Sequence, residues 1–228
     1  MAAGPESGRV ADGHVQGALR ELRRLVEQDI DRYLVLRPHR SRWRVPWSTH
    51  GARASAIYRL GHWLLSSRSR EGLHRRVLWW AYLVLVKVIE MTTGISIAAE
   101  ARIGSGLYIG HFGCIVVGGG VVMGTNCNLS QGVTIGEGGR PGSWGSPRIG
   151  NRVYLAPGAK VFGPIVVGDD VAIGANAVVT QSLPDRAVAV GVPAQIVSYR
   201  GSFDFVRYFG MEGDPERARS LLVRDTGA

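Results

Sequence analysis

Cysteine is scarce in this chain, which has only Cys114 and Cys127 among 228 residues. A framework of disulfides is therefore excluded, and the cytoplasm is the expected location. Both cysteines stand beside aliphatic residues, so we expect two buried, reduced thiols. The first 17 residues are small and polar and lack the apolar segment of a secretory signal peptide.

Long apolar runs are also missing. The longest run, 77–89, has 13 residues and contains Lys87, whereas a membrane-spanning helix needs about 20 residues. The run therefore predicts a helix that packs against the rest of the chain or a neighbouring subunit. The alternative is peripheral contact with the inner face of a membrane.

Acidic residues are few in the first part of the chain. Residues 1–93 hold 16 Lys/Arg and 8 Asp/Glu, a net charge of +8, whereas residues 94–228 hold 11 and 10, a net charge of +1. The excess peaks between Arg37 and Arg53, where five arginines have no acid among them. Such a patch attracts anionic surfaces, but a solvated basic face is an equal interpretation. Since no nucleic-acid motif accompanies the charge, we expect no nucleic-acid partner.

Histidine is nearly absent from the second part, where His111 is the only one after residue 93. A zinc site there would need several histidine ligands. We therefore predict no metal.

Helical spacing of apolar residues appears three times before residue 94. The spacing predicts helices over 17–36, 51–66 and 73–91, with Gly94 ending the third. We expect residues 1–16 to be disordered and 17–93 to form an α-helical domain.

A period of six begins at residue 97. The repeated positions are all aliphatic: Ile97, Ile103, Ile109, Ile115, then after a shift of two Val117, Met123, Leu129, Ile135, and after an interruption Ile149, Leu155, Val161, Val167, Ile173, Val179. Neither a helix nor an alternating strand has this period. A triangular coil does, because each side is a short strand with an aliphatic side chain pointing inward, and stacked coils form one continuous core. The sequence thus predicts a β-helix over 94–198, an external loop at 136–148 and a C-terminal tail over 199–228.

Several motifs resemble those of the hexapeptide-repeat acyltransferases, and among them the serine acetyltransferases. They are Tyr58-Arg-Leu-Gly-His-Trp-Leu64, Gly106–His111, Gln131-Gly-Val-Thr-Ile-Gly136, Gly158-Ala-Lys160 and Gly191-Val-Pro-Ala194. The resemblance implies an all-β left-handed parallel β-helix with an N-terminal helical domain, the handedness being taken from the family. It also implies a homotrimer with active sites in clefts between neighbouring β-helices. Acetyl-CoA, the co-substrate, would lie along each cleft.

The resemblance also implies roles for individual residues. His111 stands at the position of the family's catalytic histidine, and histidine suits a base that takes a hydroxyl proton near neutral pH. Backbone N–H groups of Gly136 and Gly138 would stabilise the oxyanion. The further assignments are Gln131 to the acceptor side, Ala156 and Ala175 to the CoA arm, and Thr180 to the region near adenosine. His62 would be structural.

The chain departs from the family where serine would bind. The aspartate that orients the catalytic histidine is Ser96 here, so Ser96 or a backbone carbonyl would orient His111. The family's two acids that hold the serine amino group are replaced here by Gly110 and Arg37. A second histidine, in the external loop, is Ser146, and Trp144 is close by in the chain.

These differences favour an acceptor other than free serine, because a buried ammonium group needs carboxylate partners. Our main hypothesis is acetylation of a saccharide hydroxyl in a surface polysaccharide precursor, with Trp144 packing on the sugar. The first alternative is serine O-acetyltransferase in cysteine biosynthesis. A weakly active or inactive scaffold is the alternative from another class.

Overall fold

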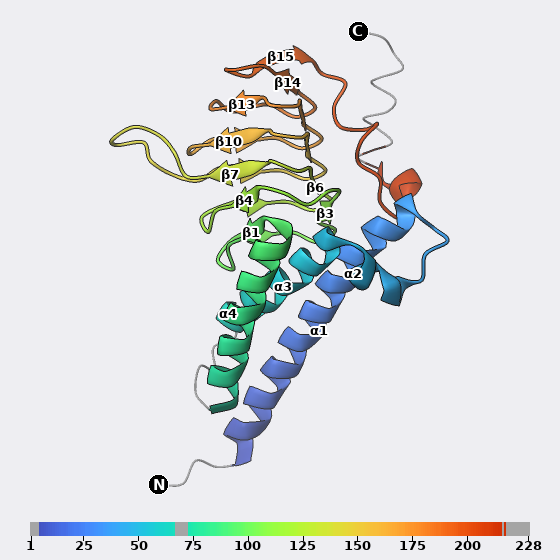
Figure 1. The fold of residues 1–228 in the computed structure, drawn as a ribbon, viewed down its shortest axis with the longest axis vertical. Coiled ribbons are helices and arrows are strands. Elements are labelled where there is room, and N and C mark those ends of the chain that lie inside the picture. Colours follow the sequence, from blue (N-terminus) through green and yellow to red (C-terminus); the bar gives the residue numbers. More distant parts are fainter. Residues whose placement is uncertain (1–4, 67–72, 216, 218–228) are drawn as a thin grey trace.

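The structure is a computed structural model that describes residues 5–66, 73–215 and 217. It consists of a helical part packed against one end of a three-sided parallel β-helix (Figure 1). The helices are α1 (Pro5–Leu36), α2 (Val45–Ser48), α3 (His50–Ser66) and α4 (Leu73–Thr93), with short 3₁₀ helices at Arg42–Arg44 and Met211–Gly213.

The observed helices differ from the expected ones mainly at the N-terminus. We expected disorder through residue 16, but α1 begins at Pro5. Proline suits the first turn of a helix, and the Ala, Glu, Arg and Gln residues that follow are good helix formers. Residues 1–4 lie outside the described part. Gly94 ends α4 with φ of 64°, as the sequence predicted.

Short strands form three sheets, one on each side of the coil, and neighbouring strands are parallel except for β14 and β15. Sheet A contains β1 (Ile95–Ile97), β4 (Ile115–Val117), β7 (Thr134–Gly136), β10 (Lys160–Phe162) and β13 (Val178–Val179). Sheet B contains β2 (Arg102–Ile103), β5 (Val122–Met123), β8 (Arg148–Ile149) and β11 (Val166–Val167). Sheet C contains β3 (Tyr108–Ile109), β6 (Asn128–Leu129), β9 (Tyr154–Leu155), β12 (Ala172–Ile173), β14 (Val188–Val190) and β15 (Gln195–Ser198).

The aliphatic residues spaced by six form the core of the coil. All fourteen predicted positions point into one hydrophobic cluster and are at most 9 % exposed. The shift of two arises in β4, where the first and third residues are both buried and the middle one is exposed. Ile115 therefore ends one series of inward positions and Val117 begins the next. The loop after β7 leaves the coil before β8, as predicted, and projects from the side of sheet A (Figure 1).

The two cysteines differ in exposure. Cys127 is buried at 1 % and belongs to the core, as predicted. The prediction for Cys114 was wrong, because Cys114 is exposed. It stands at the corner before β4 with φ of 51°, where the next residue, Ile115, takes the inward position and Cys114 faces out.

The first coil has an open edge, because no coil lies beneath it to pair its backbone groups. Side chains from α1 and α3 pair them instead. The Tyr33 hydroxyl accepts from Ile109 N and donates to Ile109 O, both at 3.2 Å. The Tyr58 hydroxyl likewise accepts from Ile103 N at 3.2 Å and donates to Ala101 O at 2.8 Å.

Charged side chains complete this edge. Asp29 accepts from Leu107 N at 2.8 Å and forms a two-fold ion pair with Arg59, at 2.9 and 3.0 Å. Arg59 donates onward to the carbonyls of Ile103 and Gly104, and Arg32 donates to that of Gly106. The side chains of Asp29 and Arg59 are almost completely buried. Residues Tyr58 to His62 therefore cover the open edge of the coil. The Nδ1 atom of His62 lies 2.9 Å from Ala99 O, a contact that fits the structural role we predicted for His62.

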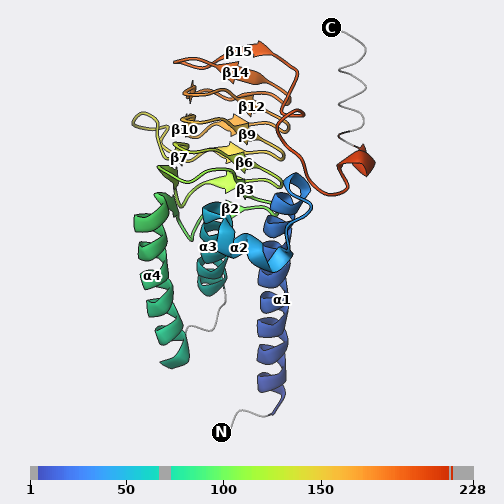
Figure 2. The same ribbon diagram turned by 45° about the vertical axis from the view of Figure 1, so that its right-hand side comes forward.

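The other end of the coil is covered by β15, which pairs with β14 in the antiparallel sense. The chain then runs back along sheet C towards α1 (Figure 2). Phe205 stacks on Tyr154 with ring centroids 4.5 Å apart, and the Arg207 carbonyl accepts from Arg32 at 2.7 Å. This part of the predicted tail is therefore packed on the coil.

Helix α4 is buried on one side only. Tyr82 and Ile89 face α3 and the coil, whereas Val77, Trp80 and Met91 are exposed. Across the residues that the structure describes, none of the helices combines the length and the apolar character needed to cross a bilayer.

The edge pairing predicts a large effect of Asp29→Asn. The substitution leaves Arg59 buried without its counter-charge, so the free energy of unfolding should fall by about 3–5 kcal/mol in urea denaturation. Asp31→Asn is the matched control, because Asp31 pairs with the exposed Arg42 at 2.8 Å and should cost under about 1 kcal/mol. Equal losses in the two variants would contradict this role of Asp29.

Candidate active site

His111 lies at an exposed corner of the first coil, between β3 and β4. The N-terminal end of α3 lies close to this corner. A Cβ at Gly51 would stand only 2.3 Å from the Ile109 carbonyl oxygen, so the close approach requires glycine. The ring of His50 packs on Phe112 with centroids 4.6 Å apart. The corner that presents His111 is thus supported by the helical part.

Successive coils stack at this corner, which we call the C–A corner because each segment there leads from sheet C to sheet A. Gly132 N donates to Gly113 O at 2.8 Å, Gly158 N to Gln131 O at 2.9 Å, and Asn176 N to Pro157 O at 2.9 Å. The structure therefore brings four predicted residues to one corner: His111, Gln131, Ala156 and Ala175.

Two of these residues have well-defined surroundings. Ala156 is 6 % exposed, donates its N–H to Ile173 O at 2.9 Å and accepts from Ala159 N at 3.1 Å. Only the second lone pair of its carbonyl remains for a ligand. The Gln131 Oε1 atom is buried and accepts no hydrogen bond within the described residues.

Five further predicted residues lie at the opposite edge of sheet A, which we call the A–B corner. They are Gly136, Gly138, Trp144, Ser146 and Thr180, all in segments that leave a strand of sheet A. A three-residue strand alone spans about 10 Å. Within one chain, the structure does not bring these residues to His111.

Glu137 organises the external loop and was missed by the sequence analysis. Its carboxylate accepts from Trp144 Nε1 at 3.4 Å and from Ser146 Oγ at 3.3 Å. Glu137 is the one acid in the glycine-rich loop 136–148, and this feature could have marked it as a candidate in the sequence. Gly138 is less suited to an oxyanion than we predicted, because its N–H already donates to Gly145 O at 3.0 Å.

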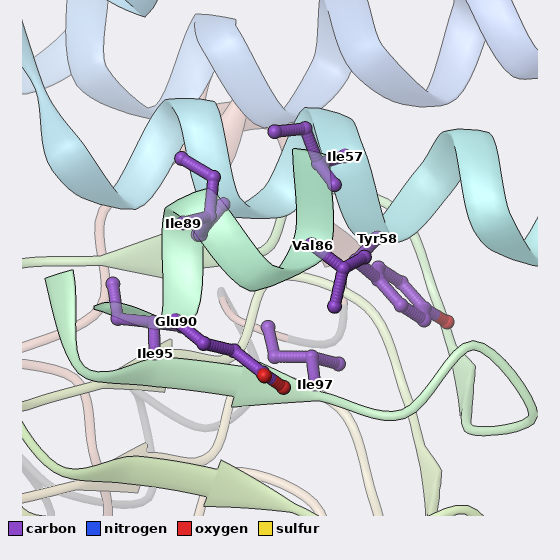
Figure 3. Close-up of a pocket in the computed structure, with 8 residues that line it drawn as sticks. Ile57, Tyr58, Val86, Ile89, Glu90, Ile95 and Ile97 are labelled. Carbon is purple, nitrogen blue, oxygen red and sulfur yellow. The ribbon is translucent and has the colours of Figure 1, made fainter. Parts of the chain in front are cut away.

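Ser96 faces α4 rather than an open site. Its hydroxyl donates to Glu90 Oε1 at 2.7 Å, and Lys87 donates to Glu90 Oε2 at 2.7 Å. The hydrogen bond from Lys87 is the main cause that lowers the pKa of Glu90, and the bond from Ser96 acts in the same direction, although partial burial acts against both. Glu90 reaches over β1 into a small hollow whose other lining residues are mostly aliphatic (Figure 3). That Ser96 orients His111 stays a prediction.

A second hollow, open to solvent, lies beside the residue that precedes His111. We call it the Arg37 pocket. It is lined by Tyr33, Leu36, Arg37, Arg40, Val45, Thr49, Tyr108 and Gly110. Arg37 and Gly110, which by the family resemblance replace the two acids that hold the serine amino group, therefore meet in one hollow. A Cβ at Gly110 would lie 3.3 Å from Tyr108 Cε1, so glycine leaves room there.

Two tyrosines form one wall of the Arg37 pocket, with ring centroids 4.8 Å apart. Burial raises the pKa of Tyr33, so its hydroxyl stays protonated and can donate to the Ile109 carbonyl. Burial also raises the pKa of Tyr108, although Arg37 and Arg32 act against it. Both hydroxyls are therefore neutral, and the charge of the pocket comes from its arginines.

Among the side chains that the structure describes, no three His, Cys, Asp or Glu residues come together as a metal site. The absence of a metal from the reaction stays a prediction.

Residues 146–181 match the family model described as bacterial transferase hexapeptide (six repeats). A solved serine acetyltransferase in complex with CoA superposes with a TM-score of 0.65 and 29 % identity, covering 83 % of this chain and 75 % of that one. The fold and the repeat thus define a hexapeptide-repeat transferase with the left-handed parallel β-helix of that class.

Sequence relatives define the family more narrowly. The serine acetyltransferase of Helicobacter pylori is 38 % identical over 159 residues, 70 % of this chain and 88 % of that protein. The serine acetyltransferase of Mycobacterium tuberculosis is 37 % identical over 160 residues, 68 % of this chain and 66 % of that protein. The Neisseria gonorrhoeae serine acetyltransferase in complex with serine has a TM-score of 0.66 and 27 % identity, covering 80 % of this chain and 72 % of that one. The chain belongs to the serine acetyltransferase family, which confirms the prediction of an acetyl-CoA-dependent O-acetyltransferase.

The edge pairing near His111 predicts the effect of Tyr33→Phe. Removing the hydroxyl leaves the N–H and C=O of Ile109 unpaired, two residues before His111, and should cost about 1–3 kcal/mol of unfolding free energy. Acetyl transfer should fall because the corner is less well held. Tyr199→Phe, which changes an exposed tyrosine, should leave the urea midpoint and the rate unchanged. A Tyr33→Phe protein as stable and active as the wild type would contradict the role of this hydroxyl.

Proposed function

We propose that His111 is the general base that removes the proton from an acceptor hydroxyl as its oxygen attacks the thioester carbonyl of acetyl-CoA. Collapse of the tetrahedral intermediate breaks the carbon–sulfur bond, and the imidazolium returns the proton to the departing thiolate. The observation that carries this proposal is the position of His111, exposed between the Arg37 pocket and the stacked C–A corner.

The C–A corner suits the thin arm of CoA, since backbone segments of successive coils line it from Gln131 to Ala175. The buried Oε1 of Gln131 lacks a partner among the described residues, and an amide N–H of the arm is a group that could satisfy it. Thr180 and Gly136 lie at the other corner, so their predicted contacts with CoA would have to be made in a neighbouring subunit's cleft.

L-Serine is the first candidate acceptor, because the relatives found in sequence and in structure are serine acetyltransferases, one of them in complex with serine. These findings favour our alternative hypothesis, serine acetylation for cysteine biosynthesis, over a polysaccharide acceptor. A saccharide remains the second candidate because of one observation: the lining of the Arg37 pocket includes no carboxylate to pair with an ammonium group.

We further propose that the complete site forms between two copies in a homotrimer. The width of sheet A separates His111 from Trp144 and Ser146 in one chain, whereas the loop of a neighbour could reach the C–A corner. This arrangement supplies the second wall of the cleft and places Glu137 and its two partners opposite His111.

Loss of the base should abolish transfer. His111→Ala should lower the rate of thiol release from acetyl-CoA in the presence of L-serine by about 10²–10⁴-fold, as measured by reaction of the released thiol with a chromogenic disulfide. His39→Ala, which changes an exposed histidine of the helical part, is the control. Serine-dependent release that survives in His111→Ala would contradict the assignment. Release with glucose or glucuronate but not with serine would favour the saccharide acceptor, and no release with any acceptor would favour the scaffold alternative.

Sharing of the site between copies predicts complementation. A His111→Ala chain and a chain lacking residues 139–144 should each be inactive alone. Co-expressed and purified together through two different tags, they should recover activity, because some interfaces pair an intact His111 with an intact loop. A mixed trimer as inactive as its parents would contradict the shared site.

A further inference from the structure

The Arg37 pocket carries an unbalanced positive charge. Arg37 follows the last residue of α1, and the turn that closes with Arg40 N donating to Arg37 O, at 3.1 Å, brings both side chains to the same cavity. The other lining residues are neutral. Two guanidinium groups therefore face the pocket without an acid in its walls.

The three acids in the last ten residues of α1 are already paired with other arginines. Asp31 pairs with Arg42 at 2.8 Å, and Glu27 pairs with Arg23 at 2.8 Å. Asp29 is committed to Arg59 at the buried edge of the coil. The only described side-chain hydrogen bond of Arg40 goes to the neutral hydroxyl of Ser48, at 2.9 Å. Most donors of the two pocket arginines thus remain available for a ligand.

We infer that the Arg37 pocket binds an anionic group of the acceptor, and that the acceptor is a hydroxy acid whose carboxylate pairs with Arg37 and Arg40 while its hydroxyl lies at His111. This inference rests on the proposed function. A planar guanidinium matches a carboxylate through two parallel hydrogen bonds. Gly110 connects the two subsites, because it lines the pocket and directly precedes His111.

The chemistry fits both candidate acceptors. L-Serine carries its carboxylate two bonds from the carbon that bears the hydroxyl, and a uronic acid carries its carboxylate on a sugar ring with several hydroxyls. A neutral sugar offers the two guanidinium groups hydroxyl acceptors but no counter-charge, so it should bind less tightly than its uronic counterpart. The walls formed by Tyr33 and Tyr108 can pack on either the short chain or the ring.

Matched ligand pairs test the inference by calorimetry, without any need for turnover. The pairs are L-serine with L-serinamide and D-glucuronate with D-glucose, each titrated into the full-length protein with CoA present. In at least one pair the carboxylate should bind about tenfold more tightly or better than its neutral partner. The pair that shows this preference identifies the source of the carboxylate.

The double variant Arg37→Gln/Arg40→Gln should remove the preference, bringing the affinity ratio close to one. Arg44→Gln is the matched control, because Arg44 is exposed nearby, packs on Trp43 at 5.0 Å and does not line the pocket. It should leave the ratio unchanged. Urea denaturation of both variants checks that they are folded, which their exposed positions favour.

The outcomes separate this inference from the proposed function. A preference for the carboxylate that depends on Arg37 and Arg40 supports the anion subsite. If acetyl transfer is then absent in a parallel assay, the proposed function fails and the anion subsite stands. Equal affinities within both pairs, no binding of either carboxylate, or a preference that survives in the double variant would overturn the inference. Acetyl transfer that depends on His111 would still support the proposed function.

Discussion

The open edge of the first coil is the constraint on which the rest of the structure depends. A parallel coil leaves the backbone groups of its first turn unpaired, and burying each of them unpaired would cost about 1–3 kcal/mol. Side chains of α1 and α3 supply the missing partners, with Asp29, Tyr33 and Arg59 at the centre. Because α1 is held here, its C-terminal end and Arg37 lie beside the corner that carries His111. Stability and the shape of the Arg37 pocket therefore have the same origin.

The functional residues divide between two corners of one sheet. The C–A corner holds His111 and the stacked backbone that would follow CoA, and the A–B corner holds the loop with Glu137, Trp144 and Ser146. The short strands of sheet A keep these groups apart within a chain. In the homotrimer that we propose, the A–B corner of one copy would face the C–A corner of the next, and the two corners together would complete the site.

Much of the fold could be predicted from the sequence, because a single physical pattern determines it. Fourteen aliphatic residues at a spacing of six predicted the coil, and each lies in its core. Local features that depend on tertiary pairing could not be predicted. The partnership of Ser96 with Glu90 and the capture of the Gly138 N–H by Gly145 arise from contacts that spacing does not encode. The exposure of Cys114 reflects a corner conformation. The charge change at Arg37 and Gly110 was visible in the sequence, but only the structure places both residues in one cavity.

A crystal structure of the protein with CoA and a carboxylate acceptor bound tests the central claim most directly, which is that the helical cap creates an acceptor pocket beside His111. We expect the CoA arm along the C–A corner, past Gln131 and Ala175, the carboxylate on Arg37 and Arg40, and the acceptor hydroxyl within about 2.6–3.2 Å of a His111 ring nitrogen. CoA bound away from this corner, or an acceptor bound outside the Arg37 pocket, would contradict the account.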